Sequence, residues 1–423
     1  MISKDSNNYV GQPIFKQILN VIPREKFDLL AKTSKTDHYY KAFPAWKQLV
    51  SLLFGIFSRC DSMIELCDGM LAMQGKLNHL GFESSPAKST AGDGLRKRDN
   101  EFFKSFYFLL IEHFKDFLSV SQPNSSLGKN LFIFDSSTIK LFSDIMKGVG
   151  RNPTGDGRKK GGLKVHMLIG ADSKTPEFVN ITEGKCHDRT QLHLLSLAPF
   201  STIVFDRGYN DYKSFGFYTE RNINFVGRLK TNAVYTVAET IQSQSLGSKS
   251  GVLKEEIILL SYKENKEEKL LQLKKVTYQD EKGRIYEFIT NKLDYAGQQV
   301  ADIYKKRWTI ELLFKKLKQN FQLHYFYSDT ENGIKTQIWC TLIAHLLITV
   351  LKIKAETQKA FSTVAALIRI HLISNLEIFW VLKNCRRTYT KKKKPKNKDP
   401  NIQMTIFKGG GVTISSKNQK ALL

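Results

Sequence analysis

Cysteine is scarce in this chain, with five residues among 423. The five are scattered and form no C-x-x-C pair, which argues against a zinc site and favours a reducing compartment. The N-terminal residues lack the pattern of a secretory signal peptide. The most apolar run, Ile338 to Leu351, is shorter than a bilayer span and contains His345, so we expect a buried helix there and no membrane partner.

Acidic residues are also few relative to basic ones. The 65 lysines and arginines outnumber the 40 aspartates and glutamates, for a formal net charge of +25 and a pI near 9.6. This excess predicts a polyanionic partner, most simply nucleic acid, with an anionic membrane surface as the weaker alternative. A length of 423 residues provides enough chain for two or three domains.

Apolar residues recur at helical spacing through the first 125 residues. We predict helices at 14–22, 27–30, 46–57, 63–80 and 102–117, with Ser89 as a candidate N-cap of a short helix carrying Arg96, Lys97 and Arg98. No clear helix-turn-helix pattern is present in this region. Two interpretations remain open: a helical bundle that contacts DNA, and a bundle that only supports the next domain.

Beyond residue 130, two short apolar runs end in an acid. Leu131 to Phe134 leads to Asp135, and Thr202 to Phe205 leads to Asp206. Either acid alone is as consistent with a turn, cap or salt bridge as with a functional role. Around them we predict strands at 163–170, 178–182 and 224–227, helices at 188–197 and 212–221, and a mobile basic loop at 151–162. This order predicts a mixed sheet with helices packed on it.

The stretch from Ala301 to Asn320 reads as one amphipathic helix with two arcs. Its apolar arc predicts burial of Ile303, Ile310, Leu313, Phe314, Leu317 and Phe321. A neighbouring stripe holds Tyr304, Arg307, Glu311 and Lys318 at spacings of 3, 4 and 7. Taken alone, the stripe also fits an ordinary solvated salt-bridge face.

The joint pattern of Asp135, Asp206 and Glu311 is unlikely to arise by chance in a chain with this excess of basic residues. Three carboxylates without a nearby histidine or cysteine suit hard, oxygen-preferring cations such as Mg²⁺ or Mn²⁺. The set therefore predicts a divalent metal site.

These residues resemble the DDE transposases of the IS4 insertion-sequence type. The similarity rests on IFDSSTIKLF around Asp135, on TIVFDRGYNDY around Asp206, and on a Y-x2-R-x3-E-x6-K motif formed by Tyr304, Arg307, Glu311 and Lys318. It covers roughly residues 131–352. The last motif is specific, because four residue types are fixed at three spacings.

The resemblance implies an RNase H-like fold, with Asp135 on the first strand, Asp206 at the end of the fourth and Glu311 on a later helix. It implies that these three residues are catalytic and hold two divalent ions. It also implies that Tyr304, Arg307 and Lys318 contact DNA.

The predicted organisation has five parts. They are an N-terminal helical, DNA-binding domain (1–125), a first part of the catalytic core (126–229), a β-rich insertion (230–292), a second part of the core with C-terminal helices (293–384), and a basic, disordered tail (385–423).

The expected function is metal-dependent cleavage at insertion-sequence ends and strand transfer into target DNA. The partner is then double-stranded DNA, and a homodimer is expected in the synaptic complex. Two alternatives stay open: an RNase H-like nuclease that cuts DNA without joining it, and a domesticated transposase that binds DNA without catalysis.

Overall fold

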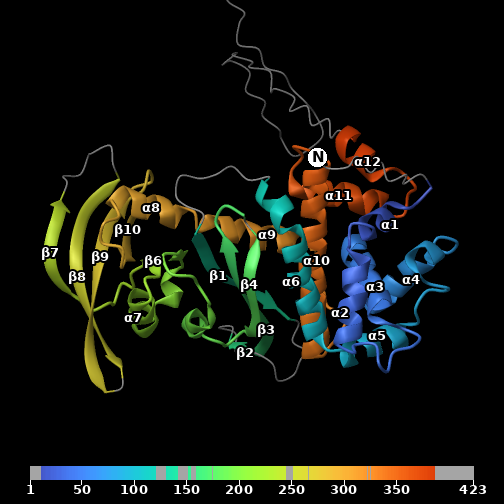
Figure 1. Ribbon diagram of the computed structural model, residues 1–423, viewed down its shortest axis with the longest axis horizontal. Helices are drawn as coiled ribbons and strands as arrows, with labels where there is room; N and C mark the ends of the chain where they lie inside the picture. Colours follow the sequence, from blue (N-terminus) through green and yellow to red (C-terminus); the bar gives the residue numbers. More distant parts are fainter. Residues whose placement is uncertain are drawn as a thin grey trace, which may run out of the picture. The chain divides into compact units, whose positions relative to one another are not determined.

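A mixed β-sheet flanked by helices and a separate helical region make up the first of two units of the chain, Met1–Asn384 (Figure 1). The computed structural model describes residues 11–120, 130–141, 151–153, 159–173, 175–243, 251–264, 266–321, 323 and 325–385. The predicted basic tail therefore lies outside the described residues, apart from Cys385.

Ten strands make up the sheet within the described residues. Their order is β2-β3-β1-β5-β6-β10-β9-β8-β7, and β4 also pairs with β3. The strands are β1 (Leu131–Lys140), β2 (Arg151–Pro153), β3 (Lys159–Gly170), β4 (Pro176–Glu183), β5 (Thr202–Val204), β6 (Asn224–Arg228), β7 (Thr236–Ser243), β8 (Val252–Glu264), β9 (Glu267–Gln279) and β10 (Ile285–Thr290).

The centre of the sheet mixes both strand directions. β1 is parallel to β5, β5 is parallel to β6, and the β1–β3 and β6–β10 pairs are antiparallel. The segment predicted as an insertion thus continues the core sheet, because β10 pairs directly with β6. These observations confirm the predicted mixed sheet with flanking helices.

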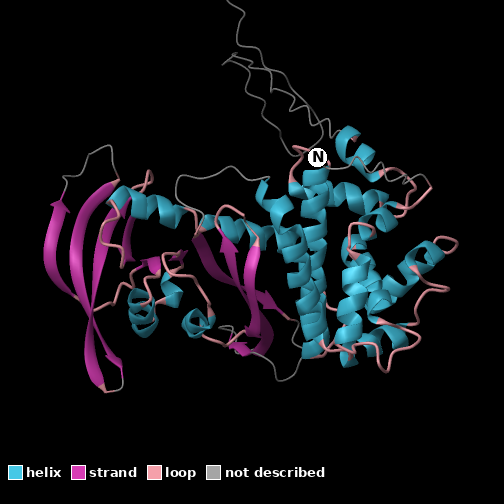
Figure 2. Cartoon of the chain, in the orientation of Figure 1, coloured by secondary structure: helices cyan, strands magenta, loops and turns pink. Residues whose placement is uncertain are grey.

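Most of the helices, cyan in Figure 2, cluster on one side of the view and the strands, magenta, on the other. Most helices lie before or after the strands in sequence. The α-helices are α1 (Ile14–Leu19), α2 (Arg24–Thr33), α3 (Ala45–Ser58), α4 (Met63–Leu71), α5 (Lys88–Lys97), α6 (Asn100–Val120), α7 (Tyr212–Glu220), α8 (Gly297–Lys305), α9 (Trp308–Phe321), α10 (Glu331–Lys354), α11 (Phe361–His371) and α12 (Ile378–Asn384). Short 3₁₀ helices are η1 (Leu77–Leu80), η2 (Asp188–Leu194) and η3 (Arg207–Tyr209).

Helix α10 is the central helix of the helical region and packs against α6, α3, α5 and α11. By length and composition it is apolar enough to cross a membrane, but 83% of its most apolar window is buried inside the protein. The prediction of a buried helix over 338–351 is therefore confirmed.

The two faces of the sheet carry different helices. α9 packs against β1, and α8 packs against β6, β9 and β10. α7, η2 and η3 belong to the other side, where aromatic rings of Phe205, Phe215 and Phe225 stack in the core cluster. A residue of β1 therefore faces one set of helices or the other according to its position in the pleat.

Several predicted elements differ from the structure. The predicted helix 63–80 stops at Leu71, and the chain turns at Gly75, whose φ of +85° is accessible to glycine at little cost. Helix α5 begins at Lys88 without a side-chain cap, so Ser89 is not its N-cap. The predicted helix 188–197 is the shorter 3₁₀ helix η2. Part of the predicted basic loop forms a hairpin, because Arg151–Pro153 pairs with Lys159–Gly161.

The predicted helix 301–320 is two helices. α8 ends at Lys305 and α9 begins at Trp308. Across this junction the backbone N–H groups of Lys306, Arg307 and Thr309 bond to carbonyls three residues back, as in a 3₁₀ turn. Tyr304 therefore lies in the last turn of α8, Arg307 lies in the junction, and Glu311 and Lys318 belong to α9. The six residues of the predicted apolar arc are all buried, as expected.

Candidate active site

Asp135 lies inside β1 rather than at its end, because the strand continues to Lys140. Ser136 to Lys140 pair with β3, which extends the strand beyond the apolar run. The side chain of Asp135 is only 15% exposed. Its Oδ1 accepts a hydrogen bond from the backbone N–H of Ser136 at 2.8 Å.

Asp206 follows β5 by two residues and precedes η3. The predicted fourth strand is β5 because the short strand β2 was not foreseen. In the parallel pair β1–β5, Ile133 lies opposite Val204. Asp135 and Asp206 each follow two residues later, so the topology brings the two acids to neighbouring places at the same edge of the core.

Tyr304 reaches Asp206 from α8. Its hydroxyl donates to Oδ1 of Asp206 at 3.1 Å, and its ring packs on Phe288 with centroids 4.6 Å apart. Burial, with the Asp206 carboxylate nearby, raises the pKa of Tyr304 above its usual value. The hydroxyl therefore remains a hydrogen-bond donor at neutral pH.

Arg307 joins the two other acids. Nη1 donates to Oδ2 of Asp135 at 2.8 Å, and Nη2 donates to Oε1 of Glu311 at 2.5 Å. Its side chain is 15% exposed. Although burial alone would lower the pKa of Arg307, the neighbouring Tyr304, Asp135 and Glu311 raise it overall. One guanidinium thus pairs with two carboxylates that come from distant parts of the chain, and a net negative charge remains.

A cavity of about 420 Å³ opens between β1 and α9 beside this cluster. Asp135 and Glu311 line it, together with Ser136, Ser137, Phe314, Lys315, Lys318 and Gln319. Lys318 donates from Nζ to the backbone carbonyl of Thr138 at 2.9 Å. The cavity therefore combines two carboxylates with lysines on one helix.

Burial dominates the electrostatics of Asp135. It raises the pKa of this carboxyl to about 6, while Arg307 and the Ser136 N–H lower it and Asp206 and Glu311 raise it. A carboxylate in this environment is costly unless a cation accompanies it. The cluster therefore favours nearby positive charge, which Arg307 supplies only in part.

The three acids do not surround one point as they stand. Within the described residues, no three side chains of histidine, cysteine, aspartate or glutamate lie close enough to hold one metal ion. Arg307 instead links Asp135 to Glu311, and Tyr304 contacts Asp206. Arg307 therefore occupies Oδ2 of Asp135 and Oε1 of Glu311, two of the oxygens that a shared cation would use.

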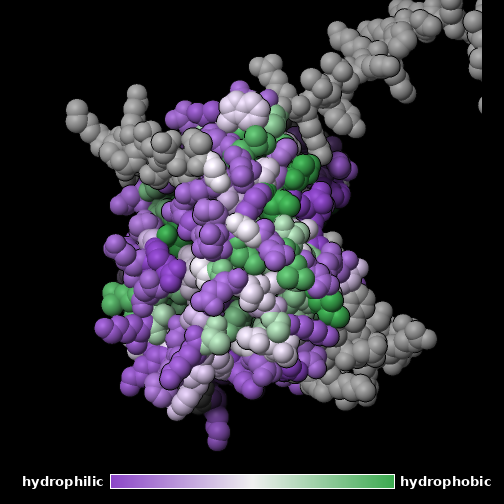
Figure 3. All heavy atoms as spheres, turned by 90° about the vertical axis from the view of Figure 1, so that its right-hand side faces the viewer, coloured by the Kyte–Doolittle hydropathy of each residue, from purple (hydrophilic) through white to green (hydrophobic). Residues whose placement is uncertain are grey.

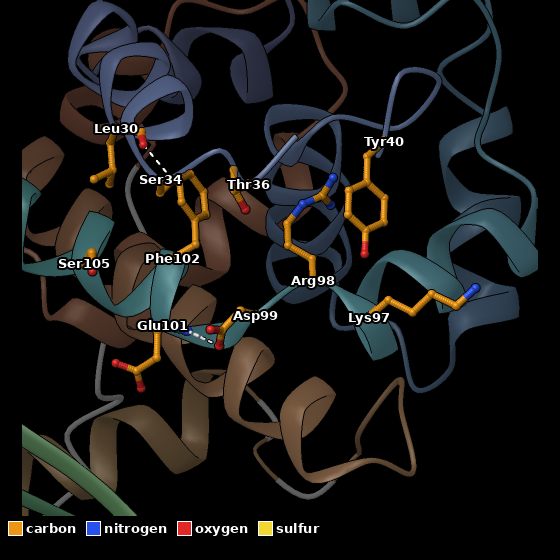
Figure 4. Close-up of a pocket in the computed structure, with 10 residues that line it drawn as sticks. All are labelled: Leu30, Ser34, Thr36, Tyr40, Lys97, Arg98, Asp99, Glu101, Phe102 and Ser105. Atoms are coloured by element: carbon orange, nitrogen blue, oxygen red, sulfur yellow. Dashed lines mark hydrogen bonds between the residues drawn. The ribbon is translucent and has the colours of Figure 1, made fainter. Parts of the chain in front are cut away.

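The predicted basic triplet of the helical region separates into buried and exposed members. Arg98 is 1% exposed and donates to Gln48, Asp37 and the Phe43 carbonyl. Figure 4 shows it beside Tyr40 at a cavity of about 280 Å³. Its role is therefore structural, and it lies just after α5, which ends at Lys97.

Arg96 and Lys97 remain at the surface, where both pair with Asp93. The face of the helical region seen in Figure 3 is largely hydrophilic, with groups of hydrophobic side chains between the hydrophilic ones. Arg96 and Lys97 are thus the members of the triplet that are accessible to a polyanion.

Sequence reasoning missed Asp188 and Lys164, which bond to each other next to Asp135, where Asp188 also accepts a bond from Ser136. Oδ1 of Asp188 accepts from Ser136 Oγ at 2.9 Å and from Lys164 Nζ at 3.2 Å. The available signal was weak, since Asp188 only began a predicted helix and Lys164 only alternated with apolar residues in a predicted strand.

Comparison with known protein families gives two matches. A model of the transposase DDE domain matches residues 126–347, which include all three acids, and a domain of unknown function matches residues 10–83. The first match covers more than half of the chain.

Individual relatives agree with this match. A Sinorhizobium fredii protein named as a transposase, y4zB, is 27% identical over 45% of this chain and 53% of its own length. A transposase for the insertion element IS5377 of Geobacillus stearothermophilus is 26% identical over 60% of this chain and 65% of its own length. One for IS4SA of Synechocystis is 24% identical over 63% and 72%. The chain thus spans less than two thirds of the first two relatives.

The mixed sheet with flanking helices agrees with the RNase H-like fold of this family. The DDE acronym denotes the same order of two aspartates and one glutamate that Asp135, Asp206 and Glu311 follow. By its matching domain and its fold, the chain belongs to the DDE transposase family of insertion sequences.

Proposed function

We propose that this protein is a transposase that cleaves DNA at the ends of an insertion sequence and joins those ends to target DNA. The observation that supports this most is the convergence of Asp135, Asp206 and Glu311, from β1, the turn after β5, and α9, around Tyr304 and Arg307. Relatives named as insertion-sequence transposases support the same function.

The donor set fits Mg²⁺ or Mn²⁺. Three carboxylates supply only oxygen ligands, which hard divalent cations prefer, and the raised pKa of Asp135 marks a site that favours added positive charge. We assign Asp135, Asp206 and Glu311 as the residues that hold two such ions. Bound ions would activate a water or a DNA 3′-hydroxyl and stabilise the leaving oxygen.

The remaining residues of the motif are proposed to hold DNA. Arg307 offers a planar fork that suits a phosphate, Lys318 offers a point charge at the rim of the cavity, and Tyr304 offers a hydroxyl donor. Because Arg307 holds Asp135 and Glu311, contact with a phosphate requires it to exchange partners. The same exchange releases the two carboxylates for the cations.

We further propose that the catalytic form is a homodimer on paired DNA ends in the bacterial cytoplasm. Two ends that are joined to one target need two active sites held together. With a net charge of +25, free subunits repel each other, and bound DNA reduces this repulsion. Light scattering with and without paired end DNA measures the change in mass.

Cleavage and strand-transfer assays test the function. The substrate is DNA that carries the inverted repeats flanking this reading frame, with Mg²⁺ or Mn²⁺ added. Asp135→Asn, Asp206→Asn and Glu311→Gln should each reduce cleavage by about a thousandfold or more and leave DNA binding intact. Asp302→Asn is the matched control, since this exposed acid on α8 bonds only to Gln298 among the hydrogen bonds described.

Two results would contradict the proposal. Cleavage without joining would indicate a nuclease of the same fold, and DNA binding without cleavage under any metal condition would indicate a domesticated transposase.

A further inference from the structure

Asp188 occupies a position behind the strand that carries Asp135. Successive residues of β1 face opposite sides of the sheet, so Ser136 points away from the α9 side that Asp135 faces. On that far side, Ser136 lies opposite His166 of β3, and Thr138 lies opposite Lys164. Asp188 of η2 lies over these residues.

The carboxylate of Asp188 is held by three neighbours. Oδ1 accepts from Ser136 Oγ at 2.9 Å and from Lys164 Nζ at 3.2 Å, and it lies 3.7 Å from Nδ1 of His166. His166 is fully buried, and its Nδ1 forms no hydrogen bond within the described residues. A buried polar group without a partner, aimed at Asp188, indicates that this carboxylate organises the cluster.

The other oxygen of Asp188 faces the turn that carries Asp206. A Cβ placed on Gly208 would lie 3.7 Å from Oδ2 of Asp188, which is ordinary van der Waals contact. Gly208 is two residues after Asp206 in η3. Asp188 therefore bonds to β1 through Ser136 and lies close to Gly208 of η3, in the turn that follows Asp206.

The segment that presents Asp188 is itself well anchored. Lys164 also donates to the carbonyl of Cys186 at 2.8 Å, and Tyr218 of α7 donates to the carbonyl of Leu192 at 2.7 Å. A carboxylate on a fixed element, with a lysine as counter-ion, can hold its partners without adding net charge to the site.

We propose that Asp188 is a positioning residue of the active site. It holds Ser136, whose backbone N–H donates to Asp135, and it keeps the turn of Asp206 against β1. This inference rests on the proposed function for its catalytic consequence. The structural claim is separate, and it says only that Asp188 stabilises the conformations of β1 and η3.

The test combines catalysis with two readouts that need no turnover. The variants are Asp188→Ala, Ser136→Ala and the double variant, and Asp172→Asn is the control. Asp172 is as exposed as Asp188, at 27% against 26%, and its nearest ion pair is a long 3.8 Å contact with Lys306. The measurements are single-turnover cleavage in a preformed DNA complex, Mn²⁺ affinity by electron paramagnetic resonance, and hydrogen exchange of β1 and η3 by mass spectrometry.

We expect Asp188→Ala to lower the cleavage rate and the Mn²⁺ affinity about ten- to a hundredfold, with DNA affinity changed less than about twofold. Hydrogen exchange should quicken in β1 and η3 and stay constant in β8 and β9. The double variant should be no slower than Asp188→Ala, because both residues act through one contact.

Multiplicative effects in the double variant, or unchanged exchange in β1 and η3, would overturn the proposal. So would a general loss of DNA binding and thermal stability, which would assign Asp188 a purely structural role. If the unaltered protein fails to cleave DNA, the proposed function fails, and the exchange and Mn²⁺ measurements still decide the role of Asp188.

Discussion

The hydroxyl of Tyr304 donates to Asp206 across 98 residues of sequence. The contact joins the last turn of α8 to the turn after β5, so the end of α8 must be placed correctly for the site to form. Substitutions can test three neighbouring features: the guanidinium of Arg307, Lys318 at the cavity rim, and Glu255, which bonds to the first residue of α8.

Tyr304→Phe should slow cleavage about tenfold, because it removes the donor to Asp206 and keeps the ring on Phe288. The loss of one hydrogen bond to a charged group should lower the free energy of unfolding by about 1.5 to 3 kcal/mol at most. Tyr286→Phe is a matched control, since Tyr286 also packs on Phe288 and donates to a different acid, Asp280. Equal losses of cleavage in the two variants would contradict the assignment.

Arg307→Ala should destabilise the protein by about 3 to 5 kcal/mol without added metal, since two largely buried carboxylates lose their cation. Added Mg²⁺ should then raise the melting temperature of this variant more than that of the unaltered protein, because cations substitute for the guanidinium. Thermal unfolding with and without Mg²⁺ checks both effects. Arg284→Ala, which breaks an exposed pair with Asp280, should cost about 1 kcal/mol or less.

Lys318→Ala should weaken binding of end DNA with little change in stability, because this exposed side chain bonds only to the Thr138 carbonyl among the described contacts. Loss of one phosphate contact should flatten the slope of log affinity against log salt by about 0.9. Fluorescence anisotropy at a series of salt concentrations gives the slope. Lys305→Ala, at an exposed position on α8, is the control. If Lys318→Ala leaves the slope as unchanged as this control does, Lys318 is a solvated lysine that does not contact DNA.

Glu255→Gln should slow cleavage about tenfold, whereas Glu256→Gln should not. Both glutamates form buried ion pairs on β8, with Lys274 at 2.6 Å and Lys275 at 2.8 Å. Glu255 also accepts the N–H of Gly297, where α8 begins, and a Cβ at Gly297 would clash with it at 2.4 Å.

Both variants lose a charge from a buried ion pair, but only Glu255 also bonds to the start of α8. A difference in their cleavage rates therefore reports on the placement of α8. Chemical unfolding should show similar losses of stability for the two, and cleavage should be compared where both remain folded. Equal cleavage rates in the two variants would contradict the idea that Glu255 on β8 positions α8 for the active site.

His166→Gln should flatten the dependence of stability on pH. Burial, opposed by Asp188, lowers the pKa of His166 to about 4 from 6.5, so the folded state prefers the neutral ring. The unfolded chain binds the proton first, and stability falls as the pH drops from about 6.5 towards 4. Between pH 7 and pH 5 this amounts to about 2 kcal/mol. Urea unfolding of both proteins across this range should show a difference of that size.

The sequence by itself determined the features that depend on residues close together in the chain. The apolar arc of 301–320, the runs before Asp135 and Asp206, and the spacing of the Tyr304 motif depend on residues close in the chain. Side-chain periodicity within a helix or strand follows from backbone geometry, so these features can be read before any contact is known.

Tertiary structure decided the contacts between distant segments. Three contacts show this: the bridge from Arg307 to Asp135, the pairing of β10 with β6, and the bond from Ser136 to Asp188. Each depends on which segments of the chain lie side by side. Strand pairing and the neutralisation of buried charge are long-range free energies, and no local pattern of residues specifies them.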